Sequence, residues 1–244
     1  MKWQIWKKLK QAPKLNRSDI LLTALPAALW LLTLYSRPFI MDLHCTKDPL
    51  SCQKSQIFKP DQLSLENEYD TEADNHSFLT QNLTAYLAVG VPIAFGLTRI
   101  FINLLSPTQA LIQVGADLLI LGQSIAWNGA INETLRLIVQ RPRPFVYQDP
   151  FRLGSDPAHY TSFYSGHTSF VASSGSALVF SLLGRSAPTW FIALISIGVG
   201  ILIFLTGLFR VLSSRHFITD VLFAAFAGIL ISAWIALIHR RRKK

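Results

Sequence analysis

His216 and Asp220 are the first residues whose types and spacing suit catalysis. They are four positions apart, so on a helix their side chains would share a face. A carboxylate placed there would hold the imidazole in the tautomer whose other nitrogen is free to attack an electrophile. The alternative is an ordinary i,i+4 pair at a helix start, with Asp220 near the cap.

A second candidate is the tripeptide Ser165-Gly166-His167, which opens an apolar segment predicted to be helical. A helix amino terminus presents unpaired N–H groups and a favourable dipole to an anion. Gly166 would let the backbone come close, and Ser165 could add a hydroxyl donor. His167 could donate a proton to a leaving group. The alternative for Ser165 is a plain N-cap.

Arginines surround these histidines in the sequence. Arg136, Arg141 and Arg143 come before the tripeptide, and Arg210 comes shortly before His216. Guanidinium groups match phosphate oxygens with paired hydrogen bonds and stay charged at every relevant pH. Taken alone, arginines beside apolar runs could equally be side chains that trim helix ends at a membrane surface.

Together these residues predict phosphoryl transfer. The reaction needs fixed positive donors for the charge on the transferring group, with the nucleophile and the acid in line on opposite sides of phosphorus. No HExxH motif, EF-hand loop or Asp-x-Asp pair accompanies them. We therefore expect no metal and no other cofactor.

The elements that would position these residues are transmembrane helices. Half of the 244 residues are hydrophobic and only 15% are charged, which is too apolar for an ordinary soluble domain. The net charge of +9 comes from basic residues that flank apolar runs, which argues against nucleic-acid binding. Since a crossing needs about 20 apolar residues, we predict an all-α bundle of six transmembrane helices, at 19–36, 79–104, 109–139, 168–185, 187–210 and 219–239. The chain shows no internal repeat, so 1–244 is predicted to be one membrane domain.

The distribution of lysine and arginine predicts the orientation. The basic segment 1–18 and the basic tail 240–244 both belong in the cytoplasm, which requires an even number of crossings. The polar segment 37–78 and the active-site loop 140–167 would then face outward. Arginines in the outer loops run against the usual trend, which indicates an anionic partner.

Cys45 and Cys52 both lie in the predicted outer segment 37–78. Their spacing lacks the paired CxxC pattern of a zinc site. In an oxidising compartment the two residues could form a local disulfide, and we count this pair as a possible one. Two unrelated thiols are the alternative.

The three clusters resemble the signature of the type 2 phosphatidic acid phosphatase superfamily of membrane lipid phosphatases and phosphotransferases. That signature reads K-x6-R-P, then P-S-G-H, then S-R-x5-H-x3-D. Arg136 stands in place of the family's lysine, and Arg143 follows at the right spacing. Tyr164 replaces the proline of the second motif, and Phe209 replaces the first serine of the third. These replacements remove no group that the chemistry requires.

The resemblance implies a role for each matching residue. His216 would attack phosphorus and form a phosphohistidine, with Asp220 orienting it. His167 would protonate the leaving oxygen and then help to activate water. The phosphate oxygens would be held by Arg136, Arg143, Ser165, the Gly166 N–H and Arg210.

The expected function is therefore metal-independent hydrolysis of a phosphomonoester or pyrophosphate on a membrane lipid. The resemblance suggests a phosphatidylglycerophosphate, lipid A phosphate or polyprenyl pyrophosphate in a bacterial inner membrane, with the site facing the periplasm. A lipid phosphotransferase is the first alternative, and a non-catalytic lipid-binding or transport protein is the second. The expected partners are the lipid substrate and the bilayer, with no nucleic acid and no obligate protein partner.

Overall fold

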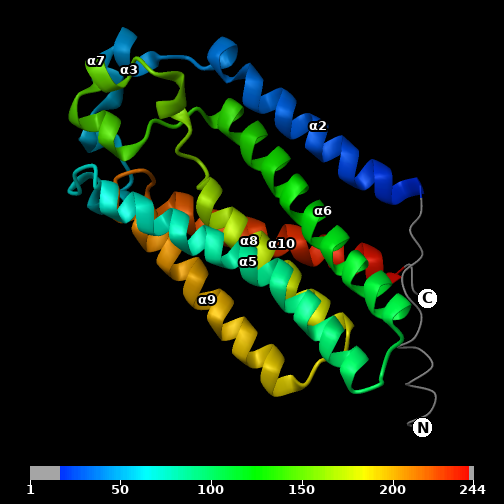
Figure 1. Cartoon of the computed structure of the whole chain (residues 1–244). Helices are drawn as coiled ribbons and strands as arrows, with labels where there is room; N and C mark the ends of the chain where they lie inside the picture. The colour runs from blue at the N-terminus through cyan, green and yellow to red at the C-terminus, as the bar shows by residue number, and fades with distance from the viewer. Residues whose placement is uncertain (1–16, 242–244) are drawn as a thin grey trace.

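The computed structural model describes residues 17–241, and the regular secondary structure in this part of the chain is all helical, with no strand. Long helices run side by side, and short turns of helix cover one end of them (Figure 1). The long helices are α2 (Arg17–Ile40), α5 (Thr71–Phe101), α6 (Pro107–Val139), α8 (Gly166–Gly184), α9 (Thr189–Leu212) and α10 (Ile218–Arg241). The predicted all-α architecture is confirmed.

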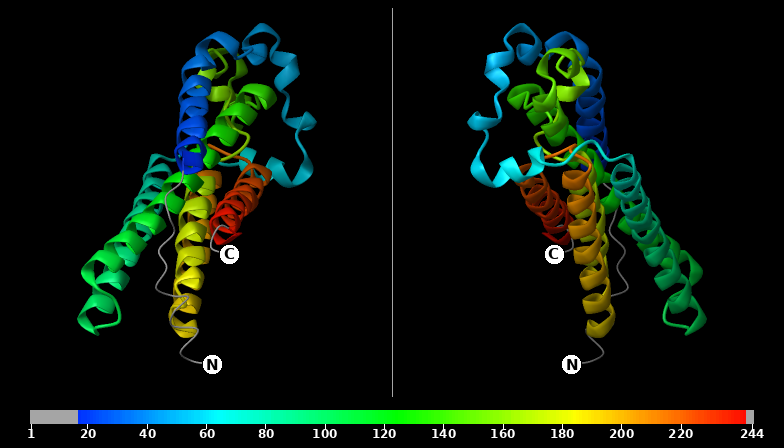
Figure 2. Two further views of the ribbon diagram at one scale, coloured as in Figure 1. Left: turned by 90° about the vertical axis from the view of Figure 1, so that its right-hand side faces the viewer. Right: turned by 90° about the vertical axis from the view of Figure 1, so that its left-hand side faces the viewer.

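The short elements lie in two connections. The first joins α2 to α5 and contains α3 (His44–Lys47), η1 (Pro49–Cys52), η2 (Lys54–Gln56), α4 (Lys59–Gln62) and η3 (Leu63–Leu65). The second joins α6 to α8 and contains η4 (Pro144–Gln148), α7 (Pro150–Leu153) and η5 (Pro157–Tyr160). Both connections cover the same end of the bundle, as the two side views in Figure 2 show. We call this end, together with the α9–α10 turn at 213–217, the loop end.

Five helices within residues 17–241 are long and apolar enough to cross a membrane: α2, α5, α6, α9 and α10, two of them together with residues beyond their ends. They support an integral membrane protein. The sixth predicted crossing, 168–185, coincides with α8, which does not reach that standard. Its sequence contains five serines between Ser169 and Ser181, and these lower its apolar character. Six crossings therefore stay a prediction, and the basic segment predicted at 1–18 lies mostly outside the described residues.

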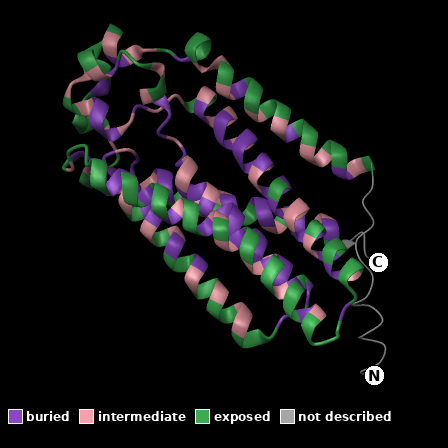
Figure 3. Cartoon of the chain, in the orientation of Figure 1, coloured by how far each residue is buried: buried purple, intermediate pink, exposed green. Residues whose placement is uncertain are grey.

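α8 is the central helix of the bundle. It packs against α5, α6, α9 and α10, and most of its residues are buried (Figure 3). Gly228 of α10 allows a close contact with α8, because a Cβ there would lie 2.6 Å from the Ser169 carbonyl oxygen. α2 instead packs mainly on α6 and leaves much of its apolar surface exposed.

The predicted polar segment 37–78 is partly helical at both ends. α2 continues to Ile40, and α5 begins at Thr71, eight residues before the predicted crossing. The early start has a local cause, since the Asp70 carboxylate caps α5 by accepting hydrogen bonds from the backbone N–H groups of Glu72 (2.8 Å) and Ala73 (3.2 Å).

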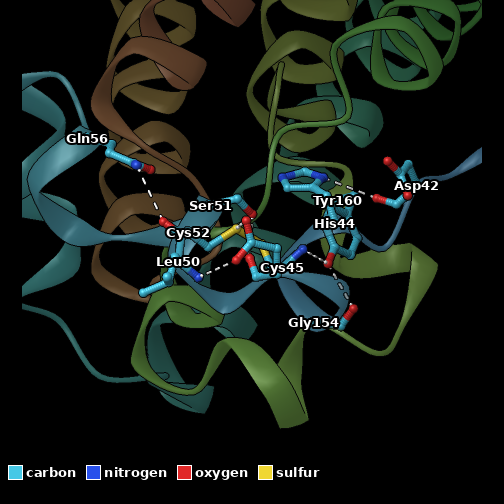
Figure 4. The surroundings of a disulfide bond; sticks show 10 residues. Asp42, His44, Cys45, Leu50, Ser51, Cys52, Gln56, Gly154 and Tyr160 are labelled. Atoms are coloured by element: carbon cyan, nitrogen blue, oxygen red, sulfur yellow. Dashed lines mark hydrogen bonds between the residues drawn. A yellow bond between two sulfur atoms is a disulfide. The ribbon is translucent and has the colours of Figure 1, made fainter.

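A disulfide joins Cys45 and Cys52 within this first connection (Figure 4). The Cys45 N–H donates to the Tyr160 hydroxyl at 3.1 Å, and that hydroxyl donates to the Gly154 carbonyl at 2.9 Å. Tyr160 is fully buried. The disulfide segment is thereby fixed to the second connection, which leads directly into α8.

Candidate active site

The predicted site residues come together at the loop end of the bundle. Arg136 lies in the last turn of α6, His167 in the first turn of α8 and Arg210 in the last turn of α9. His216 lies in the turn between α9 and α10, and Asp220 in the first turn of α10. Since successive long helices run in opposite directions, segments far apart in sequence meet here.

His216 is 1% exposed, and its Nδ1 lies 2.7 Å from the backbone carbonyl oxygen of Ser162. A carbonyl can only accept a hydrogen bond. Nδ1 therefore carries the hydrogen of the neutral ring, and Nε2 keeps the lone pair that a nucleophile needs. Burial, reinforced by the charges of Arg210, Arg143 and Arg136, holds the pKa of His216 well below its usual value, so the ring is neutral at pH 7.

Asp220 does not make the contact predicted for it. Its Oδ2 lies 3.9 Å from His216 Nδ1, and the Ser162 carbonyl takes the expected position. Residues at i and i+4 share a face only when both are helical, but α10 begins at Ile218, after His216. The Asp220 carboxylate instead accepts hydrogen bonds from the Phe217 N–H (2.9 Å) and the Ser162 hydroxyl (2.6 Å). It fixes both segments that hold the imidazole.

Arg136 and Gly166 are in close contact. A Cβ on Gly166 would lie 2.9 Å from an Arg136 guanidinium nitrogen, so glycine is needed for this approach. Arg136 also pairs with Glu133 at 2.7 Å and donates to the Tyr164 carbonyl at 3.2 Å. Ser165 is fully buried and caps α8 by accepting from the Thr168 N–H at 3.4 Å. The cap, named above as the alternative for Ser165, is what the structure shows.

Two further arginines complete the cationic cluster. Arg210 pairs with Asp74 and donates to the Ser77 hydroxyl at 3.2 Å. Arg143 donates to the Thr161 hydroxyl at 3.0 Å, and within residues 17–241 it has no carboxylate partner. The Nε atoms of Arg136, Arg143 and Arg210 are all buried, with no hydrogen-bond acceptor among the described residues. Three buried donors with unused capacity are typical of an anion site.

His167 borders the same cluster. Its Nε2 is buried, with no hydrogen-bond partner in the part of the chain that the structure describes. Its ring stands edge-on to Phe78 of α5, with centroids 4.4 Å apart. Burial lowers the pKa of His167, as it does that of His216, and the charges of Arg210, Arg136 and Arg143 reinforce the effect on both rings. Both histidines therefore border one cationic site.

Three other carboxylates of this site, besides Asp220, were not recognised in the sequence. Glu133 joins Arg136 to Arg37 of α2, Asp74 joins Arg210 to Arg215, and Asp61 pairs with Arg141. Together with Asp220, they give four carboxylates within a network of six arginines, so two positive charges are uncompensated. The i,i+3 spacing of Glu133 and Arg136 was the one available sequence signal. The others depend on tertiary contacts.

One other group of residues has metal-binding side chains. His44, Cys45 and Cys52 lie close enough together to share an ion. The two sulfurs are joined in the disulfide, and a disulfide sulfur is not a thiolate ligand. We assign no metal site there.

Apolar helices that end in a buried cluster of arginines and histidines are typical of an integral membrane protein with a candidate anion site. The family model described as the PAP2 superfamily matches residues 117–244, just over half of the chain. The protein belongs to this superfamily, whose members are phosphatases, and membership supports phosphatase or phosphotransferase activity on a lipid-like substrate. No curated protein and no solved structure matches the chain.

Proposed function

We propose that this protein hydrolyses a phosphomonoester or a pyrophosphate on a membrane lipid, through a phosphohistidine on His216. The observation that supports this most strongly is the set of buried, unused donors on Arg136, Arg143 and Arg210 around a neutral histidine. Two uncompensated positive charges suit a phosphate dianion. A merely lipid-binding protein would not need His216 held with a free Nε2.

In the first step, His216 Nε2 attacks phosphorus while the bond from phosphorus to the leaving oxygen breaks. A bound phosphate dianion offsets the arginine charges and raises the pKa of His167, so His167 is protonated in the complex and gives its proton to that oxygen. The ring of His216 becomes cationic, and its Nδ1–H keeps donating to the Ser162 carbonyl. The arginines hold the phosphoryl oxygens, whose charge is spread in the transition state. Neutral His167 then takes a proton from water, which attacks the phosphohistidine and releases phosphate.

For location, we propose that the loop end faces the periplasm of a bacterial inner membrane, with both termini in the cytoplasm. The support is the distribution of basic residues and the disulfide in the first connection, since disulfides persist in oxidising compartments. Single cysteines placed at 37–78 and 140–167, in a variant without Cys45 and Cys52, should react with an impermeant reagent in intact cells. Protection of both segments would invert the orientation.

The function is tested by phosphate release from purified lipid phosphates and pyrophosphates. The panel contains phosphatidylglycerophosphate, lipid A phosphate and polyprenyl pyrophosphate types, each with and without an acceptor lipid. Phosphate transferred to the acceptor, with little release to water, would establish the phosphotransferase alternative. Release from no lipid, with retained binding, would favour the non-catalytic one.

The histidine roles are tested by rapid-quench trapping with radiolabelled substrate, because phosphohistidine is labile in acid and survives alkali. His216→Ala should trap no label and turn over no substrate. His167→Ala should lose about 100- to 10,000-fold, and less with p-nitrophenolate as the leaving group, which needs no proton. Label trapped in His216→Ala would exclude His216 as the nucleophile.

A further inference from the structure

We propose that Asp61, in the connection between α2 and α5, is a positioning residue for the reaction proposed above, on which this inference rests. Asp61 lies outside the family match at 117–244. Its carboxylate is 1% exposed and contacts both the start of α10 and Arg141. We infer that it holds the segment containing His216 in the geometry for attack and sets the charge beside that ring.

The first step is the contact between Asp61 and α10. Oδ1 accepts the Thr219 N–H at 2.9 Å, and Oδ2 accepts the Thr219 hydroxyl at 2.6 Å. Thr219 is the second residue of α10, where the backbone N–H has no acceptor within the helix. Asp61 therefore caps α10, although it lies more than 150 residues earlier in the sequence. The capped residue, Thr219, is three residues after His216.

The second step leads from Asp61 to the imidazole. Asp61 Oδ2 pairs with Arg141 at 2.8 Å, and Arg141 pairs with Asp220 at 2.6 Å. The Arg141 guanidinium also lies 3.9 Å from the ring centroid of Phe217, the residue after His216. Asp220 then accepts from the Ser162 hydroxyl, and the Ser162 carbonyl accepts from His216. Every link is a direct contact.

The third step is electrostatic. Asp61, Arg141 and Asp220 together have one net negative charge, and Asp220 lies 3.9 Å from the His216 ring. Attack on phosphorus makes that ring cationic, and a buried negative charge nearby stabilises it. Asp61→Asn would leave Arg141 paired with the Asp220 carboxylate alone, so the net charge of these three side chains would become zero. The same substitution weakens the capping of α10.

A purely structural role for Asp61 would be to hold the first connection in place, but other contacts already do so. The Cys45–Cys52 disulfide and the hydrogen bond from the Cys45 N–H to Tyr160 fix the start of this connection (Figure 4). Near its end, the Asn67 side chain donates to the Val211 carbonyl at 3.3 Å. Loss of Asp61 should therefore affect the site more than the fold.

The test compares Asp61→Asn with Asp48→Asn, a matched control in the same connection. Asp48 is exposed and caps η1 by accepting from the Leu50 N–H at 3.1 Å, away from the arginine network. For each purified full-length variant we would measure kcat and KM on the lipid that the wild type hydrolyses best. Calorimetry would give the affinities for inorganic phosphate and for vanadate, whose five-coordinate adduct with His216 would mimic the transition state.

For Asp61→Asn we expect kcat to fall about 10- to 100-fold, the range found when residues that orient a functional histidine are replaced in metal sites. KM and phosphate affinity should change less than about threefold, because Arg136, Arg143 and Arg210 do not contact Asp61. Vanadate affinity should fall by the same factor as kcat. Asp48→Asn should match the wild type in all four quantities.

Wild-type kcat and vanadate affinity in Asp61→Asn would overturn the inference. Equal losses of phosphate and vanadate affinity would overturn it too, since they indicate a general collapse of the site. Should Asp61→Asn fail to fold, Thr219→Val is the second variant. It removes a hydroxyl that donates to Asp61 and accepts from Arg141, it keeps every charge, and it must show the same pattern at smaller size. Should no lipid phosphate be hydrolysed by the wild type, the proposed function fails, while the vanadate-to-phosphate ratio still decides the role of Asp61.

Discussion

Gly166→Ala should separate activity from stability more sharply than any other single change at this site. The new Cβ would lie 2.9 Å from an Arg136 guanidinium nitrogen, about 0.5 Å inside ordinary contact distance. The nitrogen is the far end of a flexible side chain, so it can retreat without disturbing the backbone. The fold should be unharmed, because alanine is favoured over glycine in helices, although by less at this first residue of α8 than the roughly 0.5–1 kcal/mol of a helix interior.

The guanidinium that retreats is one that should hold the phosphoryl group. A hydrogen bond to a charged group contributes about 1.5–3 kcal/mol, and tenfold in rate corresponds to about 1.4 kcal/mol. We therefore expect kcat/KM to fall about 10- to 150-fold while the unfolding temperature stays level or rises. Gly115→Ala in α6 is the matched control, since its Cβ would meet nothing within 4 Å. Full activity in Gly166→Ala, measured by phosphate release, would show that Arg136 does not act from its observed position.

Three further predictions concern pH, metals and the disulfide. Folding lowers the pKa of His216, so the unfolded chain binds an extra proton as pH falls below about 6.5. The free energy of unfolding should therefore decrease from that pH downward. Between pH 7 and 5, the unfolding temperature of His216→Gln should fall less than that of the wild type. Because arginines supply the positive charge in the proposed mechanism, phosphate release should survive EDTA, and a loss restored by one divalent ion would contradict that mechanism. Replacing Cys45 and Cys52 by serine should cost roughly 2–3 kcal/mol of stability, as expected for a short closed loop. The unfolding temperature should fall, while kcat at 20 °C stays unchanged. An unchanged unfolding temperature would argue against the disulfide.

The sequence predicted the helices well, because long apolar runs dictate them in a membrane. It placed the start of α5 eight residues late, since hydropathy alone does not register the Asp70 cap and the pairing of Asp74 with Arg210. It also overestimated the apolar character of α8. That helix is surrounded by other helices rather than exposed along its length, so it tolerates serines.

The site was predictable where spacing within one segment decides the geometry, as for Ser165, Gly166 and His167 at the start of α8. The partner of His216 was not predictable from spacing. A backbone carbonyl has no side-chain signature, and Ser162 lies 54 residues away in the sequence. The acids Asp61 and Asp74 escaped notice for a related reason. They lie in a stretch that reads as an ordinary polar loop, and only the folded chain shows that they are buried against arginines.

The arrangement of acids explains how so many arginines can be buried before any phosphate is bound. A guanidinium left unpaired in a low-dielectric interior would be strongly destabilising, and each of Arg136, Arg141 and Arg210 has a carboxylate partner. Within residues 17–241, Arg143 is the cluster's exception, with one hydroxyl as acceptor. The bound phosphoryl group should therefore complete the pairing of Arg143 and add to that of the others, without displacing their carboxylates. On the proposed mechanism, the acids would make the site stable when empty, and the excess of positive charge that they leave would favour an anion.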